Sequence, residues 1–236
     1  MRLAPVGAVG AAALAATWSA PALAPIAPPA ARALGIRTRL GCARGIALTF
    51  DDGPHPAGTP AVLEHLDRSG VVATFFLVGE QVERFPSVAA EIAAAGHEVA
   101  LHGYRHRLLL GRTSRALDRD LDRATALIED ATGRSPACYR PPYGVFSLGA
   151  LGLVRRRGLE PVLWSRWACD WRARETPQSI ARRATAKLRA GDVVLLHDAD
   201  HYCAPGSWRR TVTALLAIVE SATALGEPLV SVTQST

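Results

Sequence analysis

Residues 45–53 read GIALTFDDG, a short apolar run that ends in two aspartates and a glycine. An apolar run of this length, bounded by turn-forming residues, predicts a buried β-strand over 45–50. Asp51 and Asp52 follow that strand directly, so they would lie at its carboxyl end. The stretch therefore predicts a central strand with a pair of carboxylates at one edge of the sheet.

The rest of the chain alternates between strand and helix patterns. Apolar, β-branched or aromatic runs predict further strands over 71–78, 99–101, 137–139, 161–164, 193–196 and 229–232. Helical spacing, N-cap signals at Thr59 and Thr176, and glycine stops predict helices over 59–70, 87–95, 117–133, 148–157, 176–190 and 208–225. This alternation favours an α/β fold with right-handed crossovers and a mainly parallel sheet. About seven such units favour a closed or nearly closed barrel, with a doubly wound sheet as the alternative.

The composition excludes several classes of protein. With 49% hydrophobic and 20% charged residues, the chain is not of the disordered type. The net charge of +6 weakly favours anionic partners, but no Lys/Arg run with interleaved aromatics is present, so no nucleic acid is expected. The four cysteines have no CxxC spacing, which argues against a structural zinc site and leaves disulfides or free thiols open. They are Cys42, Cys138, Cys169 and Cys203. We expect a single domain that acts as a monomer.

The N-terminus has the pattern of an export signal. No charged residue lies between Arg2 and Arg32, and residues 3–16 are apolar. Small residues before 25 and before 34 offer cleavage sites, and prolines interrupt the second half of the segment, which disfavours a spanning helix. We expect residues 1–43 to be a signal peptide or membrane anchor that places a domain of residues 44–236 outside the cytoplasm. A disordered Ala/Pro tail on a cytoplasmic protein is the alternative.

Five polar groups follow predicted strands. In a parallel barrel the carboxyl ends of all strands lie at one rim, so these groups are expected to share one site. They are Asp51-Asp52-Gly53, His102-Gly103-Tyr104-Arg105-His106, Arg140-Pro141-Pro142-Tyr143-Gly144, Asp170-Trp171 and His197-Asp198.

Three of these residues predict a metal centre. His102 and His106 are four residues apart, which in a tight loop or single turn places both imidazoles on one side. With Asp52 they form a set of two imidazoles and one carboxylate that leaves positions for water and substrate. Zn²⁺ is the expected ion for a hydrolase, although the same set could hold non-haem Fe(II).

The remaining polar residues predict acid–base chemistry. Asp51 is the candidate base and His197 the candidate acid for a hydrolytic reaction. Arg140 could keep Asp51 ionised, and Asp170 could raise the pKa of His197. The backbone N–H of Tyr143 could aim at a developing oxyanion. The other histidines are expected to be structural or surface residues: His55, His65, His97 and His201.

Taken in order, these motifs resemble those of the polysaccharide deacetylases with a NodB-homology domain, carbohydrate esterase family 4. The matching stretches are 49–53, 74–76, 96–98 with 102–106, 140–144, 170–171 and 195–198. The resemblance runs from about Arg44 to the C-terminus. It implies a distorted (β/α)₇ barrel and metal-dependent removal of N-acetyl groups from a glycan of the N-acetylglucosamine type, such as peptidoglycan or a chitin-like polymer.

The resemblance also implies a role for each site residue. Metal binding would fall to Asp52, His102 and His106. The base would be Asp51 with Arg140 as its partner, and the acid would be His197 tuned by Asp170. The Tyr143 backbone would complete the oxyanion hole with the metal. The substrate would contact Pro142, Trp171 and Leu195, the last two around the acetyl methyl group.

Two departures from the family pattern affect these expectations. Gly103 stands where a Ser or Thr usually follows the first metal-binding histidine, and no extra aspartate precedes Asp170. Trp167, in that second region, is expected to reshape the substrate groove. The family scaffold also hosts amide hydrolases for small or lipid-linked substrates, and such a hydrolase is the alternative function. A non-enzymatic glycan-binding protein with an inactive site is disfavoured, because no metal-binding residue and no candidate base is missing from the motifs.

Overall fold

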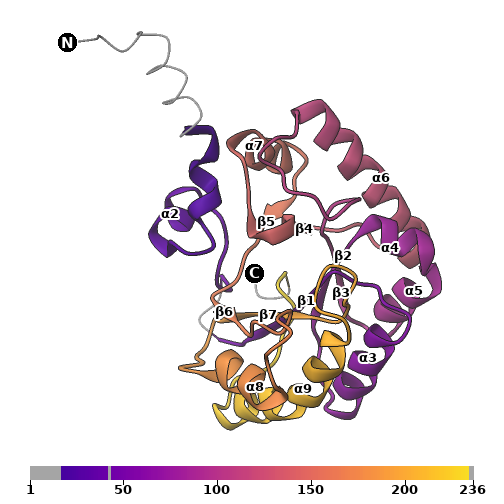
Figure 1. The fold of residues 1–236 in the computed structure, drawn as a ribbon, viewed down its shortest axis with the longest axis vertical. Helices are drawn as coiled ribbons and strands as arrows, with labels where there is room; N and C mark the ends of the chain where they lie inside the picture. The colour runs from indigo at the N-terminus through magenta and orange to yellow at the C-terminus, as the bar shows by residue number, and fades with distance from the viewer. Residues whose placement is uncertain (1–16, 42–43, 234–236) are drawn as a thin grey trace.

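The computed structural model describes residues 17–41 and 44–233. At its centre lies one sheet of seven parallel strands in the order β5-β4-β3-β2-β1-β7-β6. The strands are β1 (Ala47–Asp51), β2 (Thr74–Leu77), β3 (Glu98–Leu101), β4 (Cys138–Tyr139), β5 (Glu160–Pro161), β6 (Arg166–Trp167) and β7 (Val193–His197). The sheet curls into an incomplete barrel (Figure 1), which confirms the predicted distorted (β/α)₇ architecture.

Helices surround the sheet (Figure 1). The longer ones are α3 (Gly58–Arg68), α5 (Pro86–Ala94), α6 (Ser114–Thr132), α7 (Leu148–Arg156), α8 (Pro177–Thr185) and α9 (Ser207–Ala224). Shorter ones are η1 (Ala20–Leu23), α2 (Pro28–Ala33), α4 (Gly79–Arg84) and η2 (Pro142–Gly144). Each long helix places apolar residues against the sheet, as Leu117, Leu121 and Ile128 of α6 do. Burial of these side chains supplies most of the stabilisation of the barrel.

The central strand fixes the position of the site. Every residue of β1 is buried, and β1 pairs with β2 on one side and β7 on the other. In this register Phe50 lies opposite Phe75 and Leu196, so a continuous apolar layer forms beneath the rim. The next residue, Asp51, lies opposite His197. The strand register itself therefore places these two polar residues side by side.

Several element boundaries differ from the sequence-based predictions. The strand expected over 229–232 is reduced to a single bridge between Ile46 and Leu229, and β6 lies at Arg166–Trp167, after the expected strand over 161–164. Helix α4 was not predicted, because six residues are too few to show a repeated helical pattern of apolar residues. Its first N–H groups, on Gly79 and Glu80, donate to loop carbonyls at 2.9 and 2.8 Å.

The two predicted threonine N-caps have different outcomes. Thr176 caps α8 with a full capping box, as predicted. Thr59 was predicted as the N-cap of α3, but that helix begins at Gly58. The Thr59 hydroxyl instead accepts from the His55 N–H at 2.8 Å and donates to the buried Asp198 carboxylate. A tertiary contact thus replaces the local cap.

Part of the predicted leader is packed on the barrel. In the described part of residues 1–43, which is 17–41, Ala24, Ala31, Ile36 and Leu40 are buried in the core. Residues 1–16 and 42–43, including Cys42, lie outside the described residues. No helix within 17–41 or 44–233 combines the length and apolar character needed to cross a membrane.

Candidate active site

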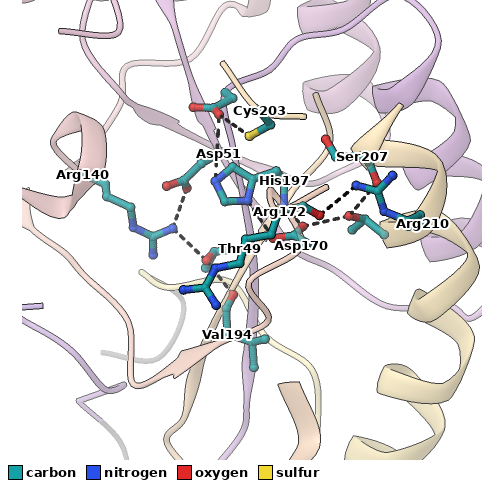
Figure 2. Close-up of polar contacts among 12 residues, drawn as sticks. Thr49, Asp51, Arg140, Asp170, Arg172, Val194, His197, Cys203, Ser207 and Arg210 are labelled. Carbon is teal, nitrogen blue, oxygen red and sulfur yellow. Dashed lines mark hydrogen bonds and ion pairs between the residues drawn. The ribbon is translucent and has the colours of Figure 1, made fainter. Parts of the chain in front are cut away.

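Residues from the carboxyl ends of the strands meet at one cavity of about 290 Å³. Figure 2 shows Asp51 and His197 close together, with Asp170 bonded to His197 and Arg140 reaching Asp51 from the side. The cavity is lined by Asp51, Asp52, His102, His106, Tyr143, Gly144, Trp164, Trp167, Trp171, Leu195, His197, Tyr202 and Cys203. The predicted polar groups at the strand ends thus lie together.

Asp52, His102 and His106 offer three donor atoms that all lie within 4.8 Å of one another. Asp52 Oδ1 is 3.5 Å from His102 Nε2 and 3.3 Å from His106 Nε2. This oxygen is buried and has no hydrogen-bond partner among the described residues. A buried carboxylate oxygen without a donor is costly unless a cation or water satisfies it. One carboxylate and two imidazoles therefore fit a divalent cation.

The conformation of Asp52 separates it from its neighbour. Asp51 is the last residue of β1, whereas Asp52 has a φ of 77°, in the left-handed region. This conformation costs about 1–2 kcal/mol for a residue with a side chain and is found at functional sites. It turns the Asp52 carboxylate toward the two histidines. Burial would raise the pKa of Asp52, but the imidazoles of His102 and His197 hold it well below its usual value.

Both histidines of the set turn Nε2 toward Asp52. His102 Nδ1 lies 2.7 Å from the Arg140 carbonyl oxygen, an acceptor that orients the ring and directs Nε2 toward Asp52. His106 stacks on Tyr202 with ring centroids 4.4 Å apart and meets the edge of Tyr143. Burial lowers the pKa of His106 to about 4, against the opposing effect of Asp52. His106 is therefore neutral at neutral pH, as a metal ligand must be.

A fully buried arginine holds Asp51. Arg140 Nη1 donates to Asp51 Oδ1 at 2.6 Å and to Thr49 Oγ1 at 2.9 Å, and Nη2 donates to the Leu163 carbonyl at 3.0 Å. The guanidinium also lies 3.9 Å from the centre of the Phe76 ring. A buried ion pair contributes little net stability because both groups lose their hydration. Its effect here is to fix the Asp51 carboxylate at the cavity wall.

A buried aspartate holds His197, the register partner of Asp51. Asp170 Oδ1 lies 2.9 Å from His197 Nδ1, and Asp170 Oδ2 accepts from the His197 backbone N–H at 2.7 Å and from Thr211 Oγ1 at 2.8 Å. Burial lowers the pKa of His197, but the Asp170 carboxylate outweighs it and raises the pKa to about 10. The imidazole is thus protonated at neutral pH, with Nε2 toward the cavity.

The remaining predicted residues form the walls of the cavity, with one exception. Tyr143 and Gly144 both have left-handed φ values, 61° and 70°, and the Tyr143 side chain is exposed at the rim. Trp171 and Leu195 line the cavity, and Trp171 meets His197 edge-on at 5.5 Å. Pro142 is buried and is not among the lining residues, so its contact with substrate stays a prediction.

The two departures from the family pattern each have a structural counterpart. Gly103 has a φ of 89°, which favours glycine over the Ser or Thr of the pattern. Trp167 lines the cavity between two other tryptophans, with ring centroids 5.4 Å from Trp164 and 6.2 Å from Trp171. The row of three indoles gives this wall of the cavity an apolar surface.

Sequence reasoning missed Tyr202 and Cys203. Both lie in the loop between β7 and α9 and line the cavity. The Tyr202 hydroxyl donates to Glu80 Oε1 at 2.7 Å, and Cys203 Sγ lies 3.4 Å from Asp52 Oδ2. The available signal was their position shortly after His197, at the carboxyl end of a strand. Three of the four cysteines, Cys138, Cys169 and Cys203, are free thiols, and Cys42 lies outside the described residues.

Comparisons with known proteins give a consistent family assignment. The family model described as polysaccharide deacetylase matches residues 41–162. The chitooligosaccharide deacetylase of Azorhizobium caulinodans is 33% identical over 191 residues, which are 77% of this chain and 89% of that protein. The peptidoglycan-N-acetylglucosamine deacetylase of Bacillus cereus is 32% identical over 80% of this chain and 86% of that protein.

Solved structures with the same fold include active and inactive proteins. The Bc1960 peptidoglycan N-acetylglucosamine deacetylase has a TM-score of 0.78 at 28% identity, covering 85% of this chain and 91% of that one. BA3943 from Bacillus anthracis, described as a CE4 family pseudoenzyme, has a TM-score of 0.75 at 25% identity, covering 84% and 67%. Similarity of fold alone therefore does not establish activity. Activity has to be inferred from the side chains at the site.

Proposed function

The chain belongs to the polysaccharide deacetylase family, and from that premise we propose that it hydrolyses the N-acetyl amide of N-acetylglucosamine units in a glycan. The observation that carries this proposal is the paired register of Asp51 and His197 beside the Asp52–His102–His106 group. A candidate base, a candidate acid and a metal-binding set all line one cavity. No part of this set is missing, which favours an active enzyme over a glycan-binding protein with an inactive site.

Asp52, His102 and His106 would hold the cation, for which Zn²⁺ is the expected choice. A divalent ion bound there would polarise the amide carbonyl and increase the acidity of water. Asp51 accepts a proton from the water that attacks the carbonyl carbon, and Arg140 holds the Asp51 carboxylate in position for that purpose. The Tyr143 backbone N–H would donate to the carbonyl oxygen as negative charge develops on it.

His197 completes the reaction at the other side of the cavity. As the C–N bond breaks, the Nε2–H of His197 protonates the departing nitrogen, which leaves as a free amine on the sugar. The acyl group leaves as acetate, with its second oxygen from the attacking water. Trp171 and Leu195 are the residues proposed to surround the acetyl methyl group. On a cell-wall glycan this reaction would take place outside the cytoplasm, as expected for an exported monomer.

Metal dependence can be tested by acetate release. We expect acetate from N-acetylglucosamine oligomers or peptidoglycan, a loss of at least about 100-fold after chelation, and recovery on adding Zn²⁺. Acetate production that is indifferent to the chelator would reject the metal-dependent mechanism. Hydrolysis confined to small or lipid-linked amides would replace the glycan with the alternative substrate class.

The Asp170→Asn variant tests the acid. Losing the carboxylate lowers the pKa of His197, so the pH above which activity falls should move down by roughly one unit or more. Protonated His197 is the active form, and therefore the loss appears on the alkaline side of the profile. Thr211→Val is the control, because it removes a hydrogen bond to Asp170 and leaves the charge. An alkaline limb at the same pH in Asp170→Asn and wild type would exclude His197 as the acid.

A further inference from the structure

A thiol lines the reaction cavity at a place that the proposed mechanism does not use. Cys203 is half-buried in the loop between β7 and α9. The residue before it, Tyr202, stacks on His106 with ring centroids 4.4 Å apart. The residue after it, Ala204, donates its N–H to the Trp171 carbonyl at 3.1 Å. Contacts on both sides therefore hold the sulfur against the cavity wall.

Cys203 belongs to a second group of potential metal ligands. Cys203, His197 and Asp52 each offer one donor atom, and the three atoms lie within 4.8 Å of one another (Figure 2). Asp52 Oδ2 is 3.4 Å from Cys203 Sγ and 3.9 Å from His197 Nε2. The ligand atoms around a tetrahedral zinc ion are on the order of 3.5 Å apart. Small side-chain movements are therefore enough to bring these three atoms onto one ion.

This group is distinct from the Asp52–His102–His106 group. Asp52 Oδ1 faces those two histidines, whereas Asp52 Oδ2 faces Cys203 and His197. A carboxylate has lone pairs on both oxygens, so each oxygen can bind a separate cation. Enzymes with two metal ions hold them about 3.5–4 Å apart, which shows that two dications are compatible at such a distance. A second ion can thus bind without displacing the first.

The His197 ring is oriented in the way that is usual for a metal-binding imidazole. Asp170 Oδ1 lies 2.9 Å from His197 Nδ1, and histidines that bind zinc through one nitrogen commonly have a carboxylate on the other. A dication that binds Nε2 and the sulfur displaces one proton from each, so the net charge of the site does not change. The sulfur also selects the ion, because thiolates favour Zn²⁺ over Mg²⁺, Ca²⁺ and Mn²⁺.

We infer that Asp52, His197 and Cys203 form a second, inhibitory site for a thiophilic divalent cation such as Zn²⁺. The inhibitory role rests on the proposed function, in which His197 Nε2–H protonates the departing nitrogen. An ion bound to Nε2 takes the place of that proton and fills part of the cavity in which the amide must lie. Excess zinc therefore stops deacetylation while the first ion stays bound.

Titration of the metal-free full chain with Co²⁺ tests this site without any substrate. A cysteine thiolate bound to Co²⁺ gives a charge-transfer band in the near ultraviolet, and equilibrium dialysis counts the bound ions. We expect about two Co²⁺ per chain with the band in the wild type, and about one without the band in Cys203→Ser. The matched control is Cys138→Ser, which should behave as the wild type because that thiol donates to Glu98 and is not among the lining residues.

The same three proteins test the inhibition. Raising Zn²⁺ from one to about ten equivalents should lower the wild-type deacetylation rate at least about tenfold, because loss of a general acid costs about 10²–10⁴-fold. Each variant is compared with its own rate at one equivalent. On that measure Cys203→Ser should lose less than about twofold, since the site keeps only two of its three donors, and Cys138→Ser should lose as much as the wild type.

Each outcome of these experiments decides the inference. A second Co²⁺, a band lost only in Cys203→Ser and relief of zinc inhibition in that variant support it. A band with only one bound Co²⁺ overturns it, because Cys203 would then bind the first cation. A wild type without the band, a band that persists in Cys203→Ser, or equal inhibition of that variant and the wild type also overturns it. Because the band needs no substrate, a protein that shows it and releases no acetate would reject the proposed function and leave the second metal site demonstrated.

Discussion

Asp51→Asn is expected to lower kcat by about 10²–10⁴-fold, because an amide cannot accept the proton that the attacking water must lose. The change removes one charge and keeps the size of the side chain. Arg140 Nη1, now 2.6 Å from Asp51 Oδ1, can still donate to the amide oxygen of the new residue. The bound metal should stay, since Asp51 is not one of the three grouped ligands.

The same variant should also be less stable. Arg140 is fully buried, and removing the charge of its partner leaves an uncompensated buried cation, which typically costs about 3–5 kcal/mol. The rate must therefore be measured per folded molecule, with the unfolding transition followed in parallel. Asp130→Asn, at an exposed position on α6, is the control for the substitution itself. A folded, metal-containing Asp51→Asn enzyme with wild-type kcat would remove Asp51 from the role of base.

Much of this rim was predictable because the polar residues come directly after buried strands. The apolar run 45–50 fixes where β1 ends, and the run 193–196 does the same for β7. The structure then pairs these two strands in a register that brings Asp51 opposite His197. The spacing of His102 and His106 was sufficient to group them with Asp52, since a short loop at a strand end keeps both imidazoles near the rim.

The parts that escaped prediction depend on tertiary contacts. Thr59 carries a local N-cap signal, but Asp198 lies nearby in the fold and takes its hydroxyl. Tyr202 sits in a loop without helical or strand periodicity, and its place against His106 follows from how that loop folds back. The conformation of Asp52 likewise comes from its surroundings, because an isolated aspartate disfavours a positive φ.

The N-terminal segment shows a different limit of sequence analysis. Its alanines and prolines are typical of a leader, and nothing in that composition indicates burial. Its position depends on backbone hydrogen bonds from Arg37 to Pro161 in β5 and from Leu40 to Gly191, just before β7. Trp18 adds a further contact, since its Nε1–H donates to the Leu110 carbonyl at 3.2 Å. Backbone pairing of this kind leaves no mark on the side-chain pattern.

His102→Ala is expected to weaken metal binding by more than about 100-fold, because loss of even an outer-shell partner of a ligand costs 10–100-fold. The alanine removes Nε2 from the three-donor group and leaves Asp52 Oδ1 facing His106 alone. Deacetylation should fall to background in the same variant. The measurement is metal content after dialysis against a competing chelator, which does not depend on any substrate.

Two further variants separate ligand loss from disturbance of the fold. His102→Ala also removes the hydrogen bond to the Arg140 carbonyl, so Asp52→Asn is needed to weaken the same metal site without touching that bond. Agreement between the two variants assigns the loss to the donor group itself. His65→Ala on α3, a histidine outside the cavity, should retain the metal of the wild type. If His102→Ala kept the full metal content, the cation would have to be held by other residues, and the roles of Asp51 and His197 would then need to be assigned around that other centre.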